Sequence, residues 1–241
     1  MARDCKLFGF KALYQDCLEC SYRRRCKMEK KYKLSCVGID QSYKRTGISV
    51  SCDGTLKLVR SYDLHKMSKH DARDKVAWQT NAAVTSALSK SEHVVVLLER
   101  IRLFSQQFIS MPYILSMGMM NGAVYDNIAD NFDDCLKSGK LEVMTVETRA
   151  WKKAVVGTTK GAANDYGVPE NKWPSVMWLS DNYPQFESSF LHESKSKKKT
   201  KSNFEIDGCF YEYDDDAVDS ACISLFPFSC PDWSSKLEAI E

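Results

Sequence analysis

Two carboxylates that end apolar runs are the residues of this sequence whose type and position most suggest chemistry. Asp40 ends a short run over 36–39, and Glu99 ends a continuous run within 93–98. Both runs have the pattern of β-strands, and ligand sites in open α/β sheets lie at the carboxyl ends of strands. An Asp after a strand is also a common turn residue, so Asp40 alone does not distinguish a site from a turn.

Two further carboxylates lie near the end of the chain. The stretch 214–226 begins with three Asp residues and continues as an apolar run, which predicts a helix with an acidic first turn. Asp216 and Asp219 are three residues apart and therefore share one face of that helix. Acidic residues also favour helix N-termini, which is the alternative explanation of this cluster. If all four carboxylates converge, their repulsion calls for a divalent cation, and oxygen ligands favour Mg²⁺ or Mn²⁺.

The elements that must position these carboxylates begin with a meander. The chain has 241 residues, of which 44% are hydrophobic, and this is enough for one core with a small appendage. Three strand-like runs over 37–64 are separated by short turns, and Asp53-Gly54 is a strong hairpin signal. We therefore expect three antiparallel strands, the first of which ends at Asp40.

A helix and two further strands are expected after the meander. Residues 65–74 are polar and predict a loop, and 75–89 have apolar residues at helical spacing. A helix between strands implies a crossover, so the strand ending at Glu99 should be parallel to its neighbour. Residues 105–136, rich in Met and Ala, predict a long helical region, and 141–147 predict a fifth strand.

The N-terminal segment is basic and contains four cysteines. Residues 1–35 have ten Lys and Arg against four Asp and Glu, a net charge of +6, which suits a polyanion such as nucleic acid or, alternatively, a solvated surface. Four thiolates at this spacing predict a zinc or other thiolate-bound metal site, with free structural cysteines and redox chemistry as alternatives. The four are Cys5, Cys17, Cys20 and Cys26. With metal bound, this arm would present an arginine cluster to phosphates. That cluster is Arg23, Arg24 and Arg25.

No part of the sequence predicts a membrane protein. No stretch is apolar and long enough to span a bilayer, and the N-terminus lacks the apolar core of a signal peptide. We therefore expect an intracellular protein, in the cytoplasm or associated with the nucleoid, whose cysteines do not form disulfides.

The order of these motifs resembles that of RuvC-type Holliday junction resolvases of the RNase H-like superfamily, over residues 37–228. Its most specific parts are Gly38-Ile39-Asp40 with Thr46-Gly47, Lys-Lys-Ala-Val-x-Gly at 152–157, and Asp216-Ala217-Val218-Asp219. The resemblance implies an α/β fold with a mixed five-stranded sheet flanked by helices. It also implies that Asp40, Glu99, Asp216 and Asp219 are catalytic ligands of two Mg²⁺ or Mn²⁺ ions. Three lysines would lie along the DNA path, namely Lys152, Lys153 and Lys172.

The chain also departs from the bacterial members of that family. Gln41 stands where they usually have Pro, and the Cys-rich arm is absent from them. A Lys-rich insertion around 181–213 is expected to form an exposed loop or hairpin, which either contacts DNA or is only a flexible insertion. These additions resemble those of phage or other mobile-element versions. The expected organisation is therefore a basic Cys-rich arm over 1–35 and an RNase H-like nuclease domain over 36–241.

The function expected from the resemblance is that of a structure-selective endodeoxyribonuclease in DNA recombination and repair. It would resolve four-way DNA junctions by paired hydrolytic cuts that leave 5′-phosphate and 3′-hydroxyl ends. Because two symmetric cuts need two sites, we expect a homodimer, with the Met-rich region as its candidate interface. The alternatives are another RNase H-like nuclease, transposon-type or RNA-directed, and a zinc-stabilised nucleic-acid-binding module without catalysis.

The cysteine arm leads to a first testable prediction. If its four thiolates bind zinc, the purified chain should contain about one zinc per chain before any chelation, because one tetrahedral structural site uses four ligands. Metal analysis by mass spectrometry measures this directly. A preparation with no stoichiometric zinc or iron would contradict the metal site and leave the cysteines as free thiols.

Overall fold

The computed structural model describes residues 31–100, 111–236 and 238–239. The expected metal site and arginine cluster of the N-terminal arm lie outside these residues, as does the segment 101–110 that precedes the long helix. The residues concerned in the arm are Cys5, Cys17, Cys20, Cys26, Arg23, Arg24 and Arg25. Within the described ranges, no helix is long and apolar enough to cross a membrane.

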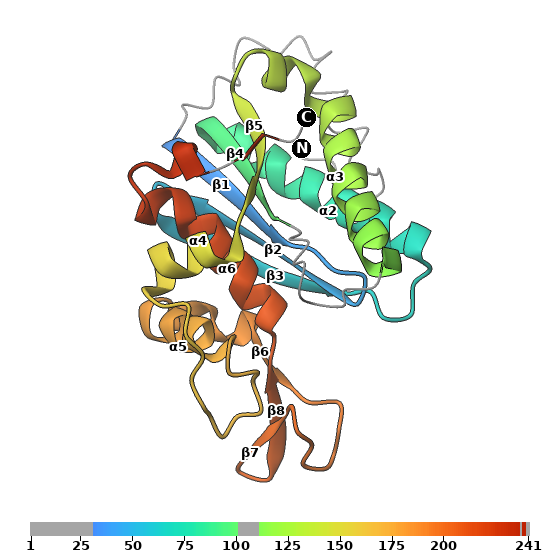
Figure 1. The fold of residues 1–241 in the computed structure, drawn as a ribbon, viewed down its shortest axis with the longest axis vertical. Helices are drawn as coiled ribbons and strands as arrows, with labels where there is room; N and C mark the ends of the chain where they lie inside the picture. The colour runs from blue at the N-terminus through green and yellow to red at the C-terminus, as the bar shows by residue number, and fades with distance from the viewer. Residues whose placement is uncertain (1–30, 101–110, 237, 240–241) are drawn as a thin grey trace, which may run out of the picture.

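The centre of the molecule is a mixed sheet of six strands in the order β3-β2-β1-β4-β5-β9 (Figure 1). Its strands are β1 (Tyr32–Asp40), β2 (Arg45–Cys52), β3 (Thr55–Asp63), β4 (Ser91–Glu99), β5 (Leu141–Val146) and β9 (Glu238–Ala239). The first three form the predicted antiparallel meander, and β4 is parallel to β1, as the crossover requires. The five predicted strands therefore form the expected mixed sheet, and the short β9 adds a sixth strand at its edge.

The hairpin between β2 and β3 is set by two residues. Asp53 and Gly54 have φ values of 45° and 78°, and two left-handed central residues are what a tight primed hairpin turn needs. The Asp53 carboxylate accepts hydrogen bonds from the backbone N–H groups of Lys33 at 3.2 Å and Leu34 at 3.0 Å. The turn residue therefore also ties the hairpin to the beginning of β1.

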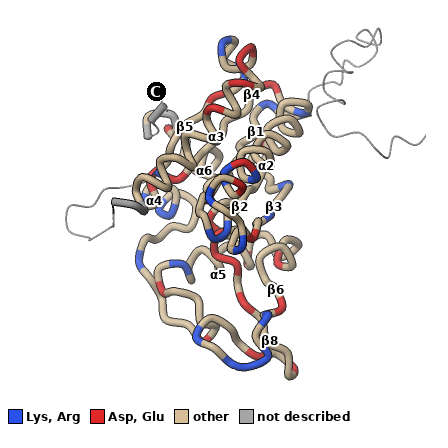
Figure 2. Tube along the Cα trace, turned by 90° about the vertical axis from the view of Figure 1, so that its right-hand side faces the viewer, with Lys and Arg blue, Asp and Glu red and all other residues tan. Residues whose placement is uncertain are grey.

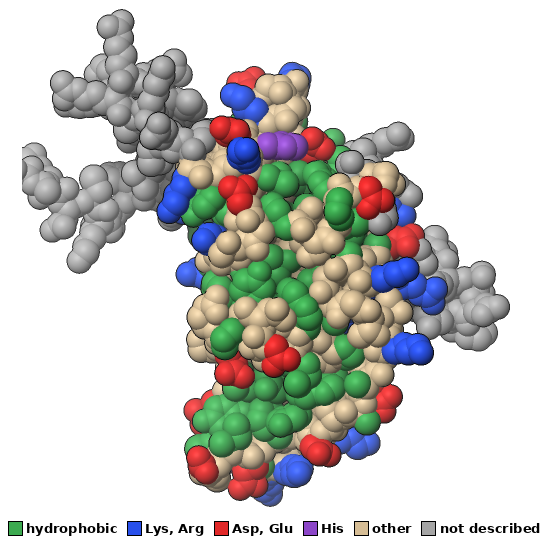
Figure 3. Space-filling view, turned by 90° about the vertical axis from the view of Figure 1, so that its left-hand side faces the viewer, with side chains coloured by type: hydrophobic (Ala, Val, Ile, Leu, Met, Phe, Trp, Pro, Cys, Tyr) green, Lys and Arg blue, Asp and Glu red, His purple; other side chains and the backbone are tan. Residues whose placement is uncertain are grey.

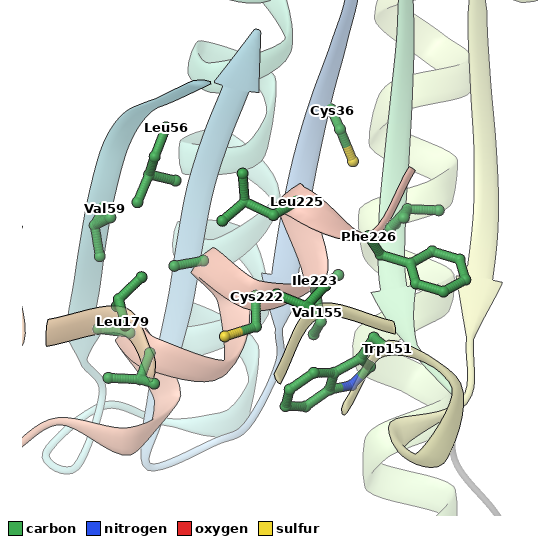
Figure 4. Close-up of a cluster of buried hydrophobic side chains, with 14 of the residues drawn as sticks. Cys36, Leu56, Val59, Trp151, Val155, Leu179, Cys222, Ile223, Leu225 and Phe226 are labelled. Atoms are coloured by element: carbon green, nitrogen blue, oxygen red, sulfur yellow. The ribbon is translucent and has the colours of Figure 1, made fainter. Parts of the chain in front are cut away.

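Helices cover both faces of the large sheet. One face packs against α2 (Lys69–Lys90) and α3 (Met111–Lys137), and the other against α4 (Thr148–Trp151), α5 (Trp173–Asn182) and α6 (Asp215–Ser229). Strand β4 is apolar throughout because both of its faces are buried: Val94 and Val96 pack toward α2, and Val95 packs toward α6. Figure 4 shows the core on the α6 side, where Ile223 and Phe226 of α6 and Trp151 lie over the sheet.

The loop prediction over 65–74 was wrong for its second half. Helix α2 begins at Lys69, and Ser68 caps it by accepting a hydrogen bond from the backbone N–H of Asp71 at 3.1 Å. The first turn carries mostly polar side chains that face solvent, so apolar spacing does not reveal it. The cap residue was the local signal for the true start.

Helix α6 lies directly on the backbone of β1 and β2. A Cβ atom on Gly38 would lie 2.4 Å from the carbonyl oxygen of Ser220, and one on Gly47 would lie 2.0 Å from that of Asp216. The Ser49 and Ser220 hydroxyls hydrogen-bond each other at 2.7 Å across the same contact. Small residues on both sides therefore let the helix approach the sheet at backbone distance, beside the end of β1.

A second, smaller sheet stands where the Lys-rich insertion was expected. After the 3₁₀ turn η3 (Pro184–Ser189), the strands β6 (Leu191–Glu193), β7 (Phe204–Ile206) and β8 (Cys209–Tyr213) pair in the order β6-β8-β7. They extend away from the large sheet, below the start of α6 (Figure 1). Hydrophobic side chains reach the surface over this part of the molecule (Figure 3), and Ile206 of β7 and Met177 of α5 are among the exposed ones.

The close contact of α6 with the sheet leads to a second prediction. Gly38→Ala should lower the free energy of unfolding by about 2 kcal/mol or more, because the added methyl group meets helix backbone that cannot move aside alone. Denaturant unfolding followed by circular dichroism measures the change. Gly118→Ala on α3 is the matched control, because a Cβ atom there has no neighbour within 4 Å and Ala favours helix by roughly 1 kcal/mol. Equal stability of the two variants would contradict the packing described.

Candidate active site

The first site residue, Asp40, lies at the carboxyl end of β1 and is buried. Because β1 and β4 are parallel and Ile39 pairs with Leu98, the next residues along the two strands, Asp40 and Glu99, are neighbours at the same sheet edge. The Oδ2 atom of Asp40 is buried without a hydrogen-bond partner among the described residues. A buried carboxylate oxygen without a partner is costly, so its presence needs a functional explanation.

Glu99 is held in place by groups from two segments, helix α4 and the residue that follows β1. Its Oε1 atom accepts hydrogen bonds from the Thr148 hydroxyl at 2.7 Å and from the Trp151 Nε1–H at 3.3 Å, both on α4. The side-chain amide of Gln41 donates to the backbone carbonyl of Glu99 at 2.7 Å. Gln41 thus links the ends of β1 and β4 through a hydrogen bond, and α4 fixes the orientation of the Glu99 carboxylate.

The remaining two carboxylates come from the first turns of α6. Asp214 caps this helix, because its Oδ1 accepts a hydrogen bond from the backbone N–H of Ala217 at 3.1 Å. Asp216 and Asp219 follow on one face, and Asp219 is buried with its Oδ1 atom unpartnered in the described part of the chain. The backbone contact between α6 and β2 sets how near these two carboxylates come to Asp40.

Lys172 lies among the carboxylates rather than on an outer surface. Its ammonium group hydrogen-bonds the Asp219 carboxylate and lies 3.9 Å from Asp40 Oδ2 and 3.6 Å from Asp215 Oδ2. Burial alone would lower the pKa of Lys172, but the charges of Asp219, Asp40 and Asp215 raise it well above the ordinary value. The lysine therefore keeps its positive charge and balances part of the acidic cluster.

The pKa values of the carboxylates show that negative charge is in excess. Burial raises the pKa of Asp40; the charge of Lys172 opposes this, and Glu99, Asp219 and Asp216 raise it further. Burial, followed by the charges of Asp215 and Asp214, raises the pKa of Asp216 to about 7. The charges of Glu99, Asp219 and Asp216 thus all act on Asp40, and the charge of Lys172 does not offset them together with burial.

The donor chemistry of this cluster fits a divalent cation. Among the described residues, no group of three or more His, Cys, Asp and Glu side chains is arranged to hold a metal ion as it stands. However, Asp40 Oδ2 and Asp219 Oδ1 are buried carboxylate oxygens to which no described residue donates a hydrogen bond, and hard cations prefer such oxygens. Binding a cation would also relieve the repulsion that raises the pKa values of Asp40 and Asp216.

The other two lysines expected along a DNA path differ from each other. Lys152 begins the π-helical turn η2 (Lys152–Val156), is only 7% exposed, and donates to the backbone carbonyl of Asn171 at 2.6 Å. Burial raises the pKa of Asp219, and the charges of Lys172 and Lys152 oppose that rise, so Lys152 acts on the cluster from inside the protein. Lys153 is exposed on the same turn.

Sequence reasoning missed the set of residues that surrounds Asp214. Its Oδ2 atom accepts a hydrogen bond from Ser61 and lies 3.4 Å from Arg45 Nη1 and 3.6 Å from His192 Nε2. Burial alone would raise the pKa of Asp214, but hydrogen bonds from His192 and Ser61 and the charge of Arg45 bring it below its ordinary value. An Asp just before an apolar helix was a signal for the cap, whereas its partners come from β2, β3 and β6 and share no local pattern.

Comparison with known proteins gives similarities in structure alone. No protein-family model matches the chain, and no curated protein sequence matches it. The structure of Thermus thermophilus RuvC has a TM-score of 0.46 and 13% identity, covering 86% of this chain and 99% of that chain. The yeast mitochondrial Holliday junction resolvase Ydc2 has a TM-score of 0.45 and 10% identity, covering 95% and 88%. The chain resembles RuvC-type resolvases in fold.

A third structure in the comparison is T. thermophilus RuvC in complex with a Holliday junction substrate. Its TM-score is 0.46 at 12% identity, and the match covers 86% of this chain and 99% of that chain. All three similarities concern the fold, because the identities are low. The arrangement of the acidic cluster in this chain is therefore argued from its own side chains.

The acidic cluster leads to a third prediction. Adding Mg²⁺ should raise the melting temperature, because a cation that binds only the folded state stabilises it by about 1.4 kcal/mol at ten times Kd. For a chain of this size that corresponds to roughly 3–6 °C. Asp40→Asn should reduce the shift, since it removes one buried charge from the cluster. Asp133→Asn, on the exposed end of α3, is the control that should keep it. An undiminished shift in Asp40→Asn would place the bound cation elsewhere.

Proposed function

We propose that this chain is a metal-dependent endonuclease that resolves four-way DNA junctions. The observation that carries the proposal is that the charges of Glu99, Asp216 and Asp219 all act on the buried Asp40 at one end of the large sheet, with the partly buried Lys172 paired to Asp40 and Asp219. The carboxylates come from the ends of β1 and β4 and from one face of α6. The burial of Asp40 and Asp219 supports a catalytic role, since each keeps one carboxylate oxygen that no described residue hydrogen-bonds, and such an oxygen is costly in a purely structural role.

Asp40, Glu99, Asp216 and Asp219 are the residues that would hold Mg²⁺ or Mn²⁺, with two ions in each site. When bound, such ions lower the pKa of water and stabilise negative charge on a phosphodiester group that is being cleaved. The products expected from the proposed hydrolysis are a 5′-phosphate and a 3′-hydroxyl.

The chain's own residues prepare this site in three ways. Thr148 and Trp151 fix the orientation of Glu99 by hydrogen bonding to the same carboxylate oxygen. Lys172 favours the ionised forms of Asp40 and Asp219, because a nearby positive charge lowers carboxyl pKa values. Lys153, exposed on the turn that begins with Lys152, would contact a backbone phosphate, a contact that positions DNA without reading its sequence.

We propose a homodimer as the working assembly, because symmetric cuts in opposite strands need two sites. Helix α3 supports an interface in this region, since Leu115 and Met119 are 60% and 55% exposed and lie four residues apart on one face. Met117 and Met120 of the same helix are buried in the chain's own core. The methionine-rich region thus serves packing on one side and leaves apolar side chains on the other.

Three further parts of the proposal concern the domain division, the zinc site and the location of the protein. The division into a Cys-rich arm over 1–35 and a nuclease domain over 36–241 stays a proposal, and β1 already begins at Tyr32. A zinc site in the arm likewise stays a prediction. An intracellular location, in the cytoplasm or at the nucleoid, fits a DNA substrate and is part of the proposal.

Cleavage of an immobile four-way DNA junction tests this function. With Mg²⁺ the chain should produce paired, symmetry-related nicks, and Asp40→Asn should lower the rate by about 10²-fold or more, because the proposed charge stabilisation depends on this carboxylate. Binding should persist in Asp40→Asn, since removing a negative charge does not weaken contact with phosphates. Gel electrophoresis of strands labelled at each end measures both the sites and the ends produced.

Matched substrates and a control variant separate the alternatives. Linear duplex, forked DNA and RNA–DNA hybrid should be cut much less than the junction, and Asp133→Asn should cut the junction at the normal rate. Cleavage of hybrid or single strands alone would support another RNase H-like nuclease. Binding to the junction without any cleavage would support a nucleic-acid-binding module.

A further inference from the structure

The connection between β6 and β7 concentrates positive charge more than any other described segment. This lysine loop, residues 194–203, contains five lysines and no acidic residue. All five side chains are exposed. They are Lys195, Lys197, Lys198, Lys199 and Lys201.

The backbone of the lysine loop is organised by its own polar residues. Asn203 is buried; its Oδ1 accepts from the backbone N–H of Thr200 at 2.6 Å, and its Nδ2 donates to the carbonyl of Lys198 at 3.0 Å. The Ser196 hydroxyl donates to the same carbonyl at 2.9 Å. Hydrogen bonds from side chains to the backbone of the same loop favour one loop conformation, so the lysines project from an ordered loop.

One end of the loop is attached near the acidic cluster. Lys195 Nζ lies 3.0 Å from Asp63 Oδ2, and Asp63 ends β3 opposite Arg45. In β6, Leu191 pairs with Tyr213, the residue immediately before the N-cap of α6. The small sheet is therefore continuous with the helix that carries Asp216, so its position follows that of the site.

The other end of the loop rests on the segment that leads to Lys172. A Cβ atom on Gly167 would lie 2.2 Å from the carbonyl oxygen of Lys201, so the two backbones are in direct contact there. The neighbouring Tyr166 ring stacks on Trp173 of α5 and meets Phe204 of β7 edge-on, with ring centroids 4.8 Å apart in each pair. Two anchors thus fix the loop between the cluster and α5.

The charges of the loop are not neutralised locally. Lys195 pairs with Asp63, but among the described residues the other four ammonium groups form no ion pair. The acidic residues of the small sheet lie on its strands and far turn rather than in the loop; they are Glu193, Glu205, Asp207 and Glu212. Figure 2 shows Lys and Arg along the lower edge of the molecule, beside β8 and in the chain between α4 and α5.

We propose that Lys197, Lys198, Lys199 and Lys201 bind the backbone phosphates of a duplex DNA arm next to the strand that is cut. This proposal rests on the proposed function, because it takes its substrate from there. Four unpaired ammonium groups on a formed loop match a row of phosphates, and long lysines contact phosphates without reading bases. The acidic cluster repels DNA, so basic groups anchored beside it are needed to bring the backbone to the site.

The salt dependence of binding tests the proposal. In the Asp40→Asn background, replacing the four lysines by Gln should reduce the slope of log Kd against log salt concentration by about 3 to 4, close to 0.9 for each lost phosphate contact. At moderate salt, Kd for the junction should rise roughly 10-fold or more. Replacing the same four by Arg should preserve the slope, because the charge remains.

The matched control changes the same net charge at the opposite edge of the large sheet. It replaces four exposed lysines near the amino ends of β1, β4 and β5 by Gln, namely Lys57, Lys90, Lys137 and Lys140. This control should leave the slope nearly unchanged. Equal effects in both quadruple variants, or no effect of the loop variant, would overturn a specific contact.

The outcomes also separate this proposal from the proposed function. Junction cleavage by the unmodified chain together with an unchanged slope in the loop variant would overturn the loop contact alone. A reduced slope without cleavage by the unmodified chain would keep the contact and overturn the nuclease. Absence of any DNA binding, or binding to RNA in preference to DNA, would overturn the contact with duplex DNA.

Discussion

The backbone contact between α6 and the first two strands is the constraint on which the site depends. At Gly38 and Gly47 there is no space for a side chain between strand and helix. The helix can therefore approach this closely only because both positions are glycine. That approach brings Asp216 and Asp219 to the edge where β1 and β4 end. A helix held one side chain further away would keep the fold but separate the carboxylates, because helix-to-sheet distance is set by the residues in contact.

The charge balance of the site follows from that constraint. Carboxylates forced together in a buried place favour their neutral forms, and Lys172 offsets this for its nearest neighbours. As a result, Asp214 and Asp216 lie in environments that shift their pKa values in opposite directions. Asp214 is surrounded by donors and has a lowered pKa, whereas Asp216, two residues later, has a raised one. One therefore builds the helix, while the other is available for a cation.

The Lys-rich insertion around 181–213 is attached to the same helices that position the acidic residues. Its small sheet is joined to α6 through β8 and to α5 through Tyr166 and Trp173, so it is part of the framework that carries the acidic residues. The lysine loop has the opposite charge to the cluster and is anchored at both ends. Acidic residues that hold cations and basic residues that hold phosphates are complementary requirements for a protein that cleaves a polyanion.

The sequence by itself determined the meander, the parallel β4, helix α6 and the carboxylates they carry, because turn residues and apolar periods act over a few neighbouring residues. It missed the start of α2, where polar residues hide the helical period. Tertiary structure alone decided that Lys172 lies inside the acidic cluster and that Lys152 is buried. It also decided which groups surround Asp214. Lysines on surfaces and lysines in buried ion pairs have the same local pattern, and only contacts between residues distant in the chain distinguish them.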